Sequence, residues 1–171
     1  MIIKRNNAFT MVELLVVILA LSIILGVISS SYITGLRLWN SGFSRSSMRT
    51  KLAQSLELIS KNLRQAKSID ALTESSITFT ADLGNGDQSY RVYLYNSADA
   101  EPNPPYTQEF YFLYWVSDDI TYGLGATLAT NILQPTSVVF SQSNNVITID
   151  LEAQEGDQIV GMSTKVRPRN L

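Results

Sequence analysis

Apolar and polar positions along this chain follow three successive patterns. Residues 9–28 form an almost continuous apolar run that contains a single acid, Glu13. From Met48 onward, apolar residues recur three or four positions apart, and after Ile69 they fall in short β-branched and aromatic runs with alternation. The first pattern predicts a membrane-crossing helix, the second an amphipathic helix and the third a β-rich head.

The apolar run is about as long as a helix needs to cross the hydrocarbon core of a bilayer, at roughly 1.5 Å of rise per residue. Lys4 and Arg5 precede the run and the next base is Arg37, so the positive-inside rule places the N-terminus in the cytoplasm and exports the head. A secretory signal peptide has a similar layout, but this run exceeds the usual h-region and no clear A-x-A site follows it. An uncleaved signal anchor is the remaining alternative.

Glu13 is an unusual residue for a membrane helix. A carboxylate costs about 2.5–3.5 kcal/mol at the bilayer centre and less near an interface, and it usually marks function. The alternative is an interfacial side chain that reaches the lipid headgroups.

The second pattern predicts an amphipathic stem. Its apolar positions have spacings of 4, 4, 3, 4 and 3 and are Met48, Leu52, Leu56, Ile59, Leu63 and Ala66. This spacing is one face of a helix, which we expect to pack under a sheet, with a coiled-coil partner as the alternative. We expect one helix from residue 9 to about residue 68. Gly26, Gly35 and Gly42 should make its middle bendable.

The third pattern predicts strands. Residues 77–80 and 90–95 read as a hairpin around the turn-forming residues 82–87. The aromatic run 109–116 is the most strand-like of the chain, so we expect it at the centre of the sheet, with its rings in the core rather than on a carbohydrate or adhesin platform. The fold class is therefore α+β, with a long N-terminal helix packed on an antiparallel sheet.

The remaining segments of the head read as loops and a late meander. The proline-rich segment 99–107 should be an exposed loop, and residues 117–134 should be loop with a short irregular element. The last strands are expected at 138–141, 146–153 and 158–166, as an antiparallel meander.

Composition narrows the chemistry. The 171 residues include no Cys and no His, so disulfides, imidazole metal sites and His-based catalysis are excluded. We find no phosphate-binding loop and no dinucleotide fingerprint, and the adjacent Asp118 and Asp119 point apart on an extended segment. The sequence therefore predicts a protein that is not an enzyme and needs no cofactor.

Charge is distributed unevenly. Between residues 36 and 69 one acid, Glu57, stands among seven bases, Arg37, Arg45, Arg49, Lys51, Lys61, Arg64 and Lys67. From residue 70 to 164 acids predominate and Arg91 is the only base, although formal net charge is only −2. The basic stem could pair with neighbouring subunits or anionic lipid, or the two regions could simply be solvated separately.

The turn at residues 82–87 contains weak candidates for a calcium site. Asp82, Asn85 and Asp87 carry hard oxygen atoms, the ligands that calcium prefers. Glycine occupies the third position of the segment, where an EF-hand loop needs Asp or Asn. We therefore expect a turn here rather than a metal site.

The string AFTMVELL at residues 8–15 resembles the processing site of the type IV pilin and pseudopilin superfamily. The resemblance implies that a prepilin peptidase cuts between Ala8 and Phe9 and then methylates the new amine of Phe9. It also implies that Glu13 pairs with the amine of an adjacent subunit and sets axial register. The family usually has Gly where this chain has Ala8, so processing should be slower.

This resemblance divides the chain into a leader (1–8), a transmembrane segment (9–29), a stem helix (30–69) and a head (70–171). The basic tail 165–171 and the head layout are similar to the larger minor pilins and minor pseudopilins of the J/W type, usually placed near a filament tip. A structural subunit that initiates or caps a type IV pilus or a type II secretion pseudopilus is therefore expected.

The implied partners are other pilins or pseudopilins, the prepilin peptidase, the inner-membrane assembly platform and lipid. The implied location is the bacterial inner membrane, crossed once, with the head exported into a surface or periplasmic filament. One alternative is an uncleaved single-pass membrane-anchored binding domain or adhesin. Another is a competence-pilus subunit for DNA uptake, although the acidic head argues against nucleic acid as a partner.

Overall fold

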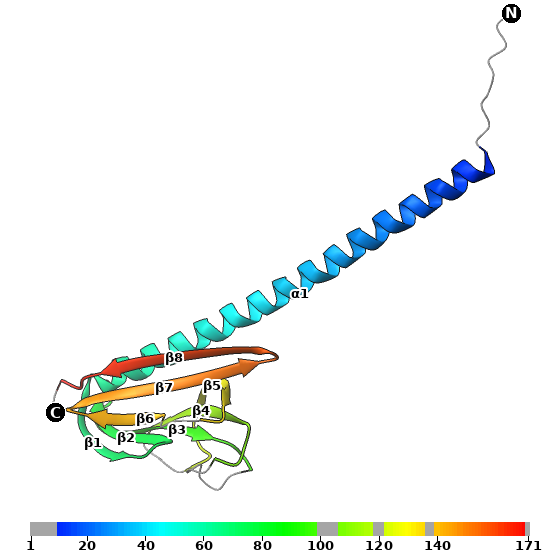
Figure 1. Cartoon of the computed structure of the whole chain (residues 1–171). Coiled ribbons are helices and arrows are strands. Elements are labelled where there is room, and N and C mark those ends of the chain that lie inside the picture. Colours follow the sequence, from blue (N-terminus) through cyan, green and yellow to red (C-terminus); the bar gives the residue numbers. More distant parts are fainter. Residues whose placement is uncertain (1–9, 99–105, 118–121, 136–138, 170–171) are drawn as a thin grey trace, which may run out of the picture. The chain divides into compact units, whose positions relative to one another are not determined.

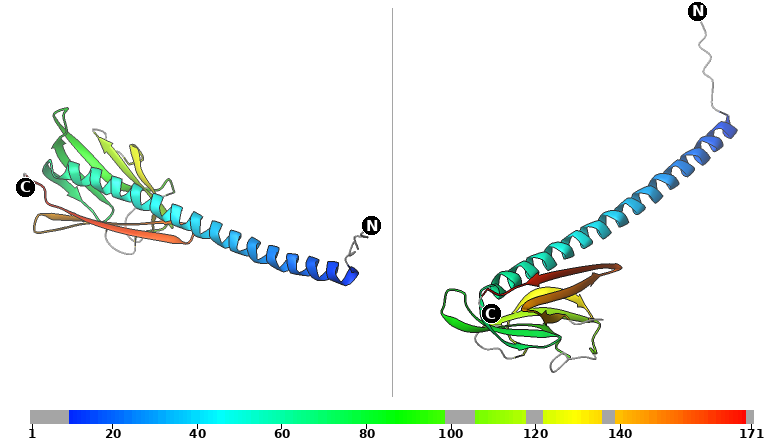
Figure 2. Two further views of the ribbon diagram at one scale, coloured as in Figure 1. Left: turned by 90° about the horizontal axis from the view of Figure 1, so that it is seen from above. Right: turned by 60° about the vertical axis from the view of Figure 1, so that its left-hand side comes forward.

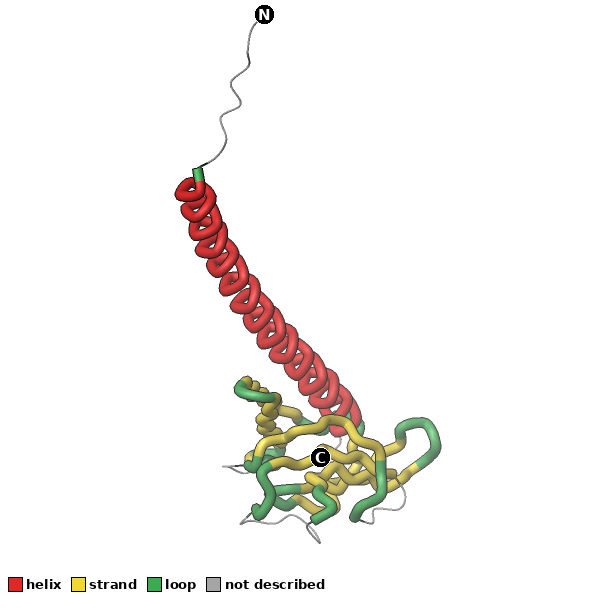
Figure 3. The backbone as a smooth tube through the Cα atoms, turned by 90° about the vertical axis from the view of Figure 1, so that its right-hand side faces the viewer, coloured by secondary structure: helices red, strands yellow, loops and turns green. Residues whose placement is uncertain are grey.

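The computed structural model describes residues 10–98, 106–117, 122–135 and 139–169. Its elements are one helix, α1 (Met11–Leu63), followed by strands (Figure 1). The strands are β1 (Ala66–Leu72), β2 (Ser76–Asp82), β3 (Asp87–Tyr95), β4 (Phe110–Ser117), β5 (Ala126–Leu133), β6 (Phe140–Ser143), β7 (Val146–Glu155) and β8 (Gln158–Val166). Helix and strand therefore segregate along the chain, which confirms the α+β prediction (Figure 3).

The chain divides into two compact units, Met1–Gly42 and Phe43–Leu171. The described part of the first unit is helical from Met11, and its large apolar side chains are exposed. The second unit contains the last part of α1 and all the strands. Only this second unit has a hydrophobic core among the described residues.

The sheet is antiparallel throughout and has the order β1-β2-β3-β4-β5-β7-β6, with β8 also paired to β7. Strand β8 pairs with β7 from Ile147 to Glu155 and so occupies nearly all of one edge of that strand. The other edge of β7 is shared, because β6 pairs with its first residues and β5 with Ala153. The late meander β6-β7-β8 and the central place of β4 are both as expected from the sequence.

The core lies between the last turns of α1 and one face of the sheet (Figure 2). The helix contributes Met48, Leu52, Leu56, Ile59 and Leu63, which are the apolar positions of the predicted stripe and are all buried. A polar contact fixes the same face, because the Ser55 hydroxyl donates to the backbone carbonyl of Leu128 at 2.8 Å. The prediction that this stripe packs under a sheet is confirmed.

Helix α1 ends earlier than expected, at Leu63 rather than near residue 68. The Gln65 amide donates to the Asn62 carbonyl at 3.0 Å, a tight turn that closes the helix, and β1 begins at Ala66. Ala66 is fully buried as the first residue of β1, and it fits the helical spacing only by coincidence. Residues 66–69, which we expected in the stem, therefore form part of the sheet.

Residues 117–134 also differ from the expectation, because the long strand β5 occupies Ala126–Leu133 instead of an irregular element. Its pairing with β4 shifts register on both sides of Leu113, and Asn131 has a positive φ of 57°. These irregularities break the alternation of buried and exposed residues that would have revealed a strand. Asp118 and Asp119, residues 99–105 and the first residue of the predicted strand at 138–141 lie outside the described residues.

Candidate assembly site at the start of the apolar helix

The site predicted from the sequence lies at the beginning of α1. Ala8 and Phe9, where cleavage and methylation are expected, lie outside the described residues, and Thr10 is the first residue described. The helix starts at Met11, and the Leu14 amide donates to the Thr10 carbonyl at 3.2 Å. Thr10 is therefore the N-cap residue and Glu13 occupies the third helical position.

Thr10 and Glu13 cap this helix reciprocally. The Glu13 amide donates to Thr10 Oγ1 at 3.3 Å, while Glu13 Oε2 accepts from both the Thr10 amide and the Thr10 hydroxyl at 3.1 Å. This geometry is a capping box, which satisfies amide donors that a helix N-terminus leaves without partners. The carboxylate also lies in the first turn, where the helix dipole favours negative charge.

The capping box directs the Glu13 carboxylate back toward the preceding residues. If the chain is cut before Phe9, its new amine belongs to the residue next to Thr10. One side chain can then cap its own helix and present negative charge at the end of that helix. Sequence reasoning identified Glu13 but missed Thr10, although the pattern T-x-x-E before an apolar run is a readable signal for this cap.

The apolar stretch after the site exposes nearly all its large side chains. Met11 is 82% exposed and Leu25 is 60% exposed. Among the described residues, α1 is the one helix long and apolar enough to cross a membrane. Two polar side chains of this part of α1 bond within the helix: the Ser22 hydroxyl donates to the Ile18 carbonyl at 2.8 Å, and the Thr34 hydroxyl donates to the Ser30 carbonyl at 2.9 Å. Such internal bonds suit a segment surrounded by lipid.

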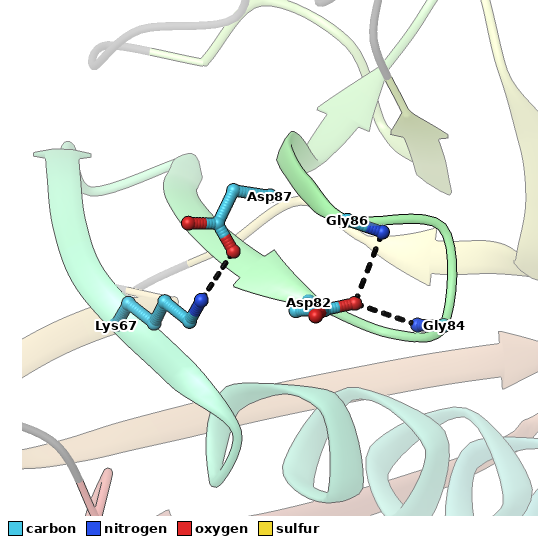
Figure 4. Close-up of polar contacts among 5 residues, drawn as sticks. All are labelled: Lys67, Asp82, Gly84, Gly86 and Asp87. Atoms are coloured by element: carbon cyan, nitrogen blue, oxygen red, sulfur yellow. Dashed lines mark hydrogen bonds and ion pairs between the residues drawn. The ribbon is translucent and has the colours of Figure 1, made fainter.

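Two of the three weak calcium candidates, Asp82 and Asp87, have protein partners (Figure 4). One carboxylate oxygen of Asp82 accepts from the amides of Gly84 at 3.0 Å and Gly86 at 3.1 Å, and Asp87 forms an ion pair with Lys67. Both glycines have positive φ, 118° and 86°, which the turn requires. No group of three His, Cys, Asp or Glu residues able to hold a metal occurs in the described ranges. The contacts of Asp82 and Asp87 support the interpretation of residues 82–87 as a turn. Asn85 lies within this turn.

The aromatic run on β4 is divided between the two faces of the sheet. Tyr111 is fully buried and Trp115 stacks on Tyr90 with ring centroids 5.2 Å apart on the core side. On the opposite face, Phe112 is 39% exposed and Tyr114 stacks on Tyr95 at 4.5 Å. The expectation that these rings lie in the core is correct for the first face and wrong for Phe112.

The fold and the site together define an α+β protein whose N-terminal helix begins with a capped acid and continues as an exposed apolar segment. Residues 3–29 match a family described as the prokaryotic N-terminal methylation motif. This range includes Ala8, Phe9, Glu13 and the whole apolar run. The match supports a relationship to the type IV pilins and pseudopilins, whose subunits are structural and assemble with other pilins. No curated protein and no solved structure matches the chain in the same comparisons.

Proposed function

We propose that this chain is a minor pilin or minor pseudopilin of the larger J/W type. In this role it is a structural subunit that initiates or caps a type IV pilus or a type II secretion pseudopilus. The observation that carries the proposal is the Thr10–Glu13 capping box at the start of an exposed apolar helix, inside the matched methylation motif. The basic C-terminal tail and the order of helix, hairpin and meander support the J/W type.

Processing is the first step of this function. A prepilin peptidase removes residues 1–8 at the Ala8–Phe9 bond and methylates the Phe9 amine. The helix then leaves the inner membrane and enters a filament through the assembly platform, with its head outside the cytoplasm. Its apolar surface exchanges lipid for the helices of other pilins, so the exposed apolar side chains of Met11 to Ile28 stay in an apolar environment throughout.

Glu13 determines register in the second step. A carboxylate that moves from one apolar environment to another requires a positive partner. Without a partner, an ion removed from water has a desolvation penalty of several kcal/mol. The Phe9 amine of a neighbouring subunit supplies that charge. The capping box holds the Glu13 carboxylate at the helix end, so less side-chain freedom is lost when the pair forms.

The test of processing is the mass of the mature N-terminus after coexpression with a prepilin peptidase. We expect a chain that begins at Phe9 and carries one methyl group. Ala8→Gly should speed cleavage and Ala8→Val should slow it, because the position before the cut admits only small residues in this family. An intact Met1 start in assembled material would contradict the proposal and favour an uncleaved membrane-anchored binding domain, the alternative that Ala8 itself suggests.

The test of register separates the charge of Glu13 from its capping role. Glu13→Gln removes the charge, but glutamine at the third helical position still completes a capping box. Thr10→Val removes the cap and leaves the charge. We expect Glu13→Gln to insert into the membrane normally and to lose incorporation in a crosslinking assay, while Thr10→Val retains most of it. Equal incorporation of Glu13→Gln and of the unaltered chain would contradict the proposal that the Glu13 charge sets axial register.

A further inference from the structure

A groove on the head lies between the last turns of α1 and strand β8 and encloses about 550 Å³. Figures 1 and 2 show these two segments side by side. The floor is apolar and is made by Ala53, Leu56 and Met162. Three bases line the same groove, Lys61, Arg64 and Arg169, and all three are exposed. The volume is that of a site that holds a ligand or a short chain segment.

The fold brings these positive charges together. The Arg169 amide donates to the Arg64 carbonyl at 3.2 Å, which fixes the C-terminal tail to the end of the helix. Pro168 is buried beside it and anchors the tail, and Lys61 lies on the preceding turn. Glu57 also lines the groove and is spaced four residues before Lys61, so it offsets one of the three charges. The groove therefore has a positive excess that an acidic partner would neutralise.

Strands β7 and β8 form a hairpin, and the turn that joins them is acidic. The β7–β8 ladder runs from Ile147–Val166 to Glu155–Gln158, so the turn at Gly156 lies about 30 Å from the end that adjoins Arg169. Glu155 and Asp157 flank that turn and are exposed. Gly156 has a φ of 59°, which makes the turn tight and narrow.

Lys51 is a basic neighbour of the acidic turn. Lys51 borders the same small hollow as Glu155, so it offsets part of that charge. Asp157 lies on the far side of Gly156 from Glu155 and does not line that hollow. Asp157 is therefore the principal charge that the turn presents to another molecule.

We propose that the groove of one subunit accepts the β7–β8 turn of a second copy of this chain. Asp157 and Glu155 of the turn then lie among Lys61, Arg64 and Arg169. Because the turn and the Arg169 end of the groove are at opposite ends of the β7–β8 hairpin, the contact between the two copies is head-to-tail. The contact rests on the filament role proposed above, and it adds an interaction between heads to the one between helices.

The absence of native cysteine allows a direct test with the full chain. Ser163→Cys on one tagged copy and Gln158→Cys, beside the turn, on a second should form a mixed disulfide after assembly. Lys61→Glu with Arg64→Glu on the first copy should lower its yield by at least roughly tenfold, because like charges then face each other. Arg45→Glu with Arg49→Glu is the matched control, since it changes charge equally on exposed helix residues that do not line the groove.

Charge exchange is the decisive measurement. Glu155→Lys with Asp157→Lys on the second copy should abolish the disulfide with the unaltered groove and restore it with the reversed groove. Circular dichroism of each variant must show a folded head. A soluble peptide of residues 150–157 should reduce the yield of the disulfide, whereas the same peptide with its Asp and Glu residues replaced by Asn and Gln should not. Failure to restore the disulfide with folded variants overturns the contact.

The same samples separate this contact from the proposed function. Cleavage before Phe9 and Glu13-dependent incorporation, without a charge-dependent disulfide, show that the head contact alone is wrong. Loss of all three shows that the filament role is wrong. Binding of vesicles with anionic lipid that depends on Lys61 and Arg64, with no mixed disulfide, assigns the groove to lipid and overturns the contact.

Discussion

The two stretches of helix α1 on either side of Gly42 are both rich in apolar residues, yet they differ in where those residues lie. Leu25, in the first stretch, is 60% exposed, whereas Leu52, in the second, is 1% exposed. Hydrophobicity therefore predicts burial only where the chain supplies a covering element, which is the sheet for the second stretch. The first stretch has no such cover among the described residues, and lipid or other helices fit that need.

Serine and glycine positions show the same contrast between residues with and without tertiary contacts. Ser22 and Ser55 each donate a hydrogen bond to a carbonyl one turn earlier, but only Ser55 also reaches a strand, at the Leu128 carbonyl. A Cβ added at Gly42 meets nothing within 4 Å, whereas one added at Gly125 lies 2.4 Å from the Trp115 carbonyl oxygen. Tertiary contact, and not residue type, should thus determine the cost of a substitution.

The largest expected effect tests burial on adjacent helix residues. Ile59 is fully buried and Leu58 is 41% exposed. Ile59→Ala should lower the free energy of unfolding by about 3 kcal/mol, because it opens a cavity under the sheet. Leu58→Ala should change it by less than about 0.5 kcal/mol. Denaturant unfolding of the full chain in detergent, followed by tryptophan fluorescence, measures both, and equal losses would contradict the contrast.

The next effect compares two glycines. Gly125 has a φ of 129°, and its Cβ position overlaps the backbone of β4, so Gly125→Ala should destabilise the head by about 1–3 kcal/mol. Gly42→Ala should instead stabilise the helix by up to about 1 kcal/mol, since alanine loses less backbone entropy in a helix. Hydrogen exchange of α1 and thermal unfolding of the head distinguish the two, and a stabilising Gly125→Ala would show that the turn adjusts freely.

A smaller effect compares two serines. Ser55→Ala should cost about 1 kcal/mol, because the Leu128 carbonyl loses a buried donor. Ser22→Ala should be neutral or slightly favourable to helix formation, since alanine has the higher helix propensity and the lost bond is internal to the helix. Ser55→Thr is a useful control because it keeps a hydroxyl. A Ser22→Ala cost equal to that of Ser55→Ala would show that the first stretch also has a specific tertiary partner.

The sequence predicts those parts of the structure in which periodicity and chemistry agree. The stripe from Met48 to Leu63 repeats with a helical period and is buried, and the hairpin around residues 82–87 follows from turn-forming residues. Glu13 stands out in the sequence because an acid in an apolar run is costly, and its role in assembly stays a prediction. These features depend on local sequence alone.

Other features depend on contacts that sequence does not display. Ala66 fits both the helical spacing and a strand, and only the pairing of β1 with β2 decides between them. Strand β5 escaped detection because irregular pairing with β4 disrupts its alternation. Arg64 and Arg169 are more than a hundred positions apart, and a backbone bond between the helix end and the tail places them in one groove. Such associations follow from topology rather than from pattern.

The smallest expected effect tests whether a polar contact stabilises the fold merely because it lies in the head. Lys67 and Asp87 form an ion pair in which both side chains are about half exposed, 49% and 56%. The hydrogen bond to Asp87 raises the pKa of Lys67 above its usual value of 10.5. A raised lysine pKa in the folded state means that any stabilisation is present below pH 10.5 and is lost as pH rises through the raised value.

Because water and salt screen this pair, Lys67→Met should leave the unfolding midpoint at neutral pH unchanged within error. Asp82→Ala, in the same turn, should cost about 1 kcal/mol, because two backbone amides lose their acceptor. Thermal unfolding at low and high salt measures both variants. A clear loss for Lys67→Met that salt does not reduce would show that an exposed contact can stabilise this head as much as a buried one, and the contrast between the two stretches would then need a cause other than burial.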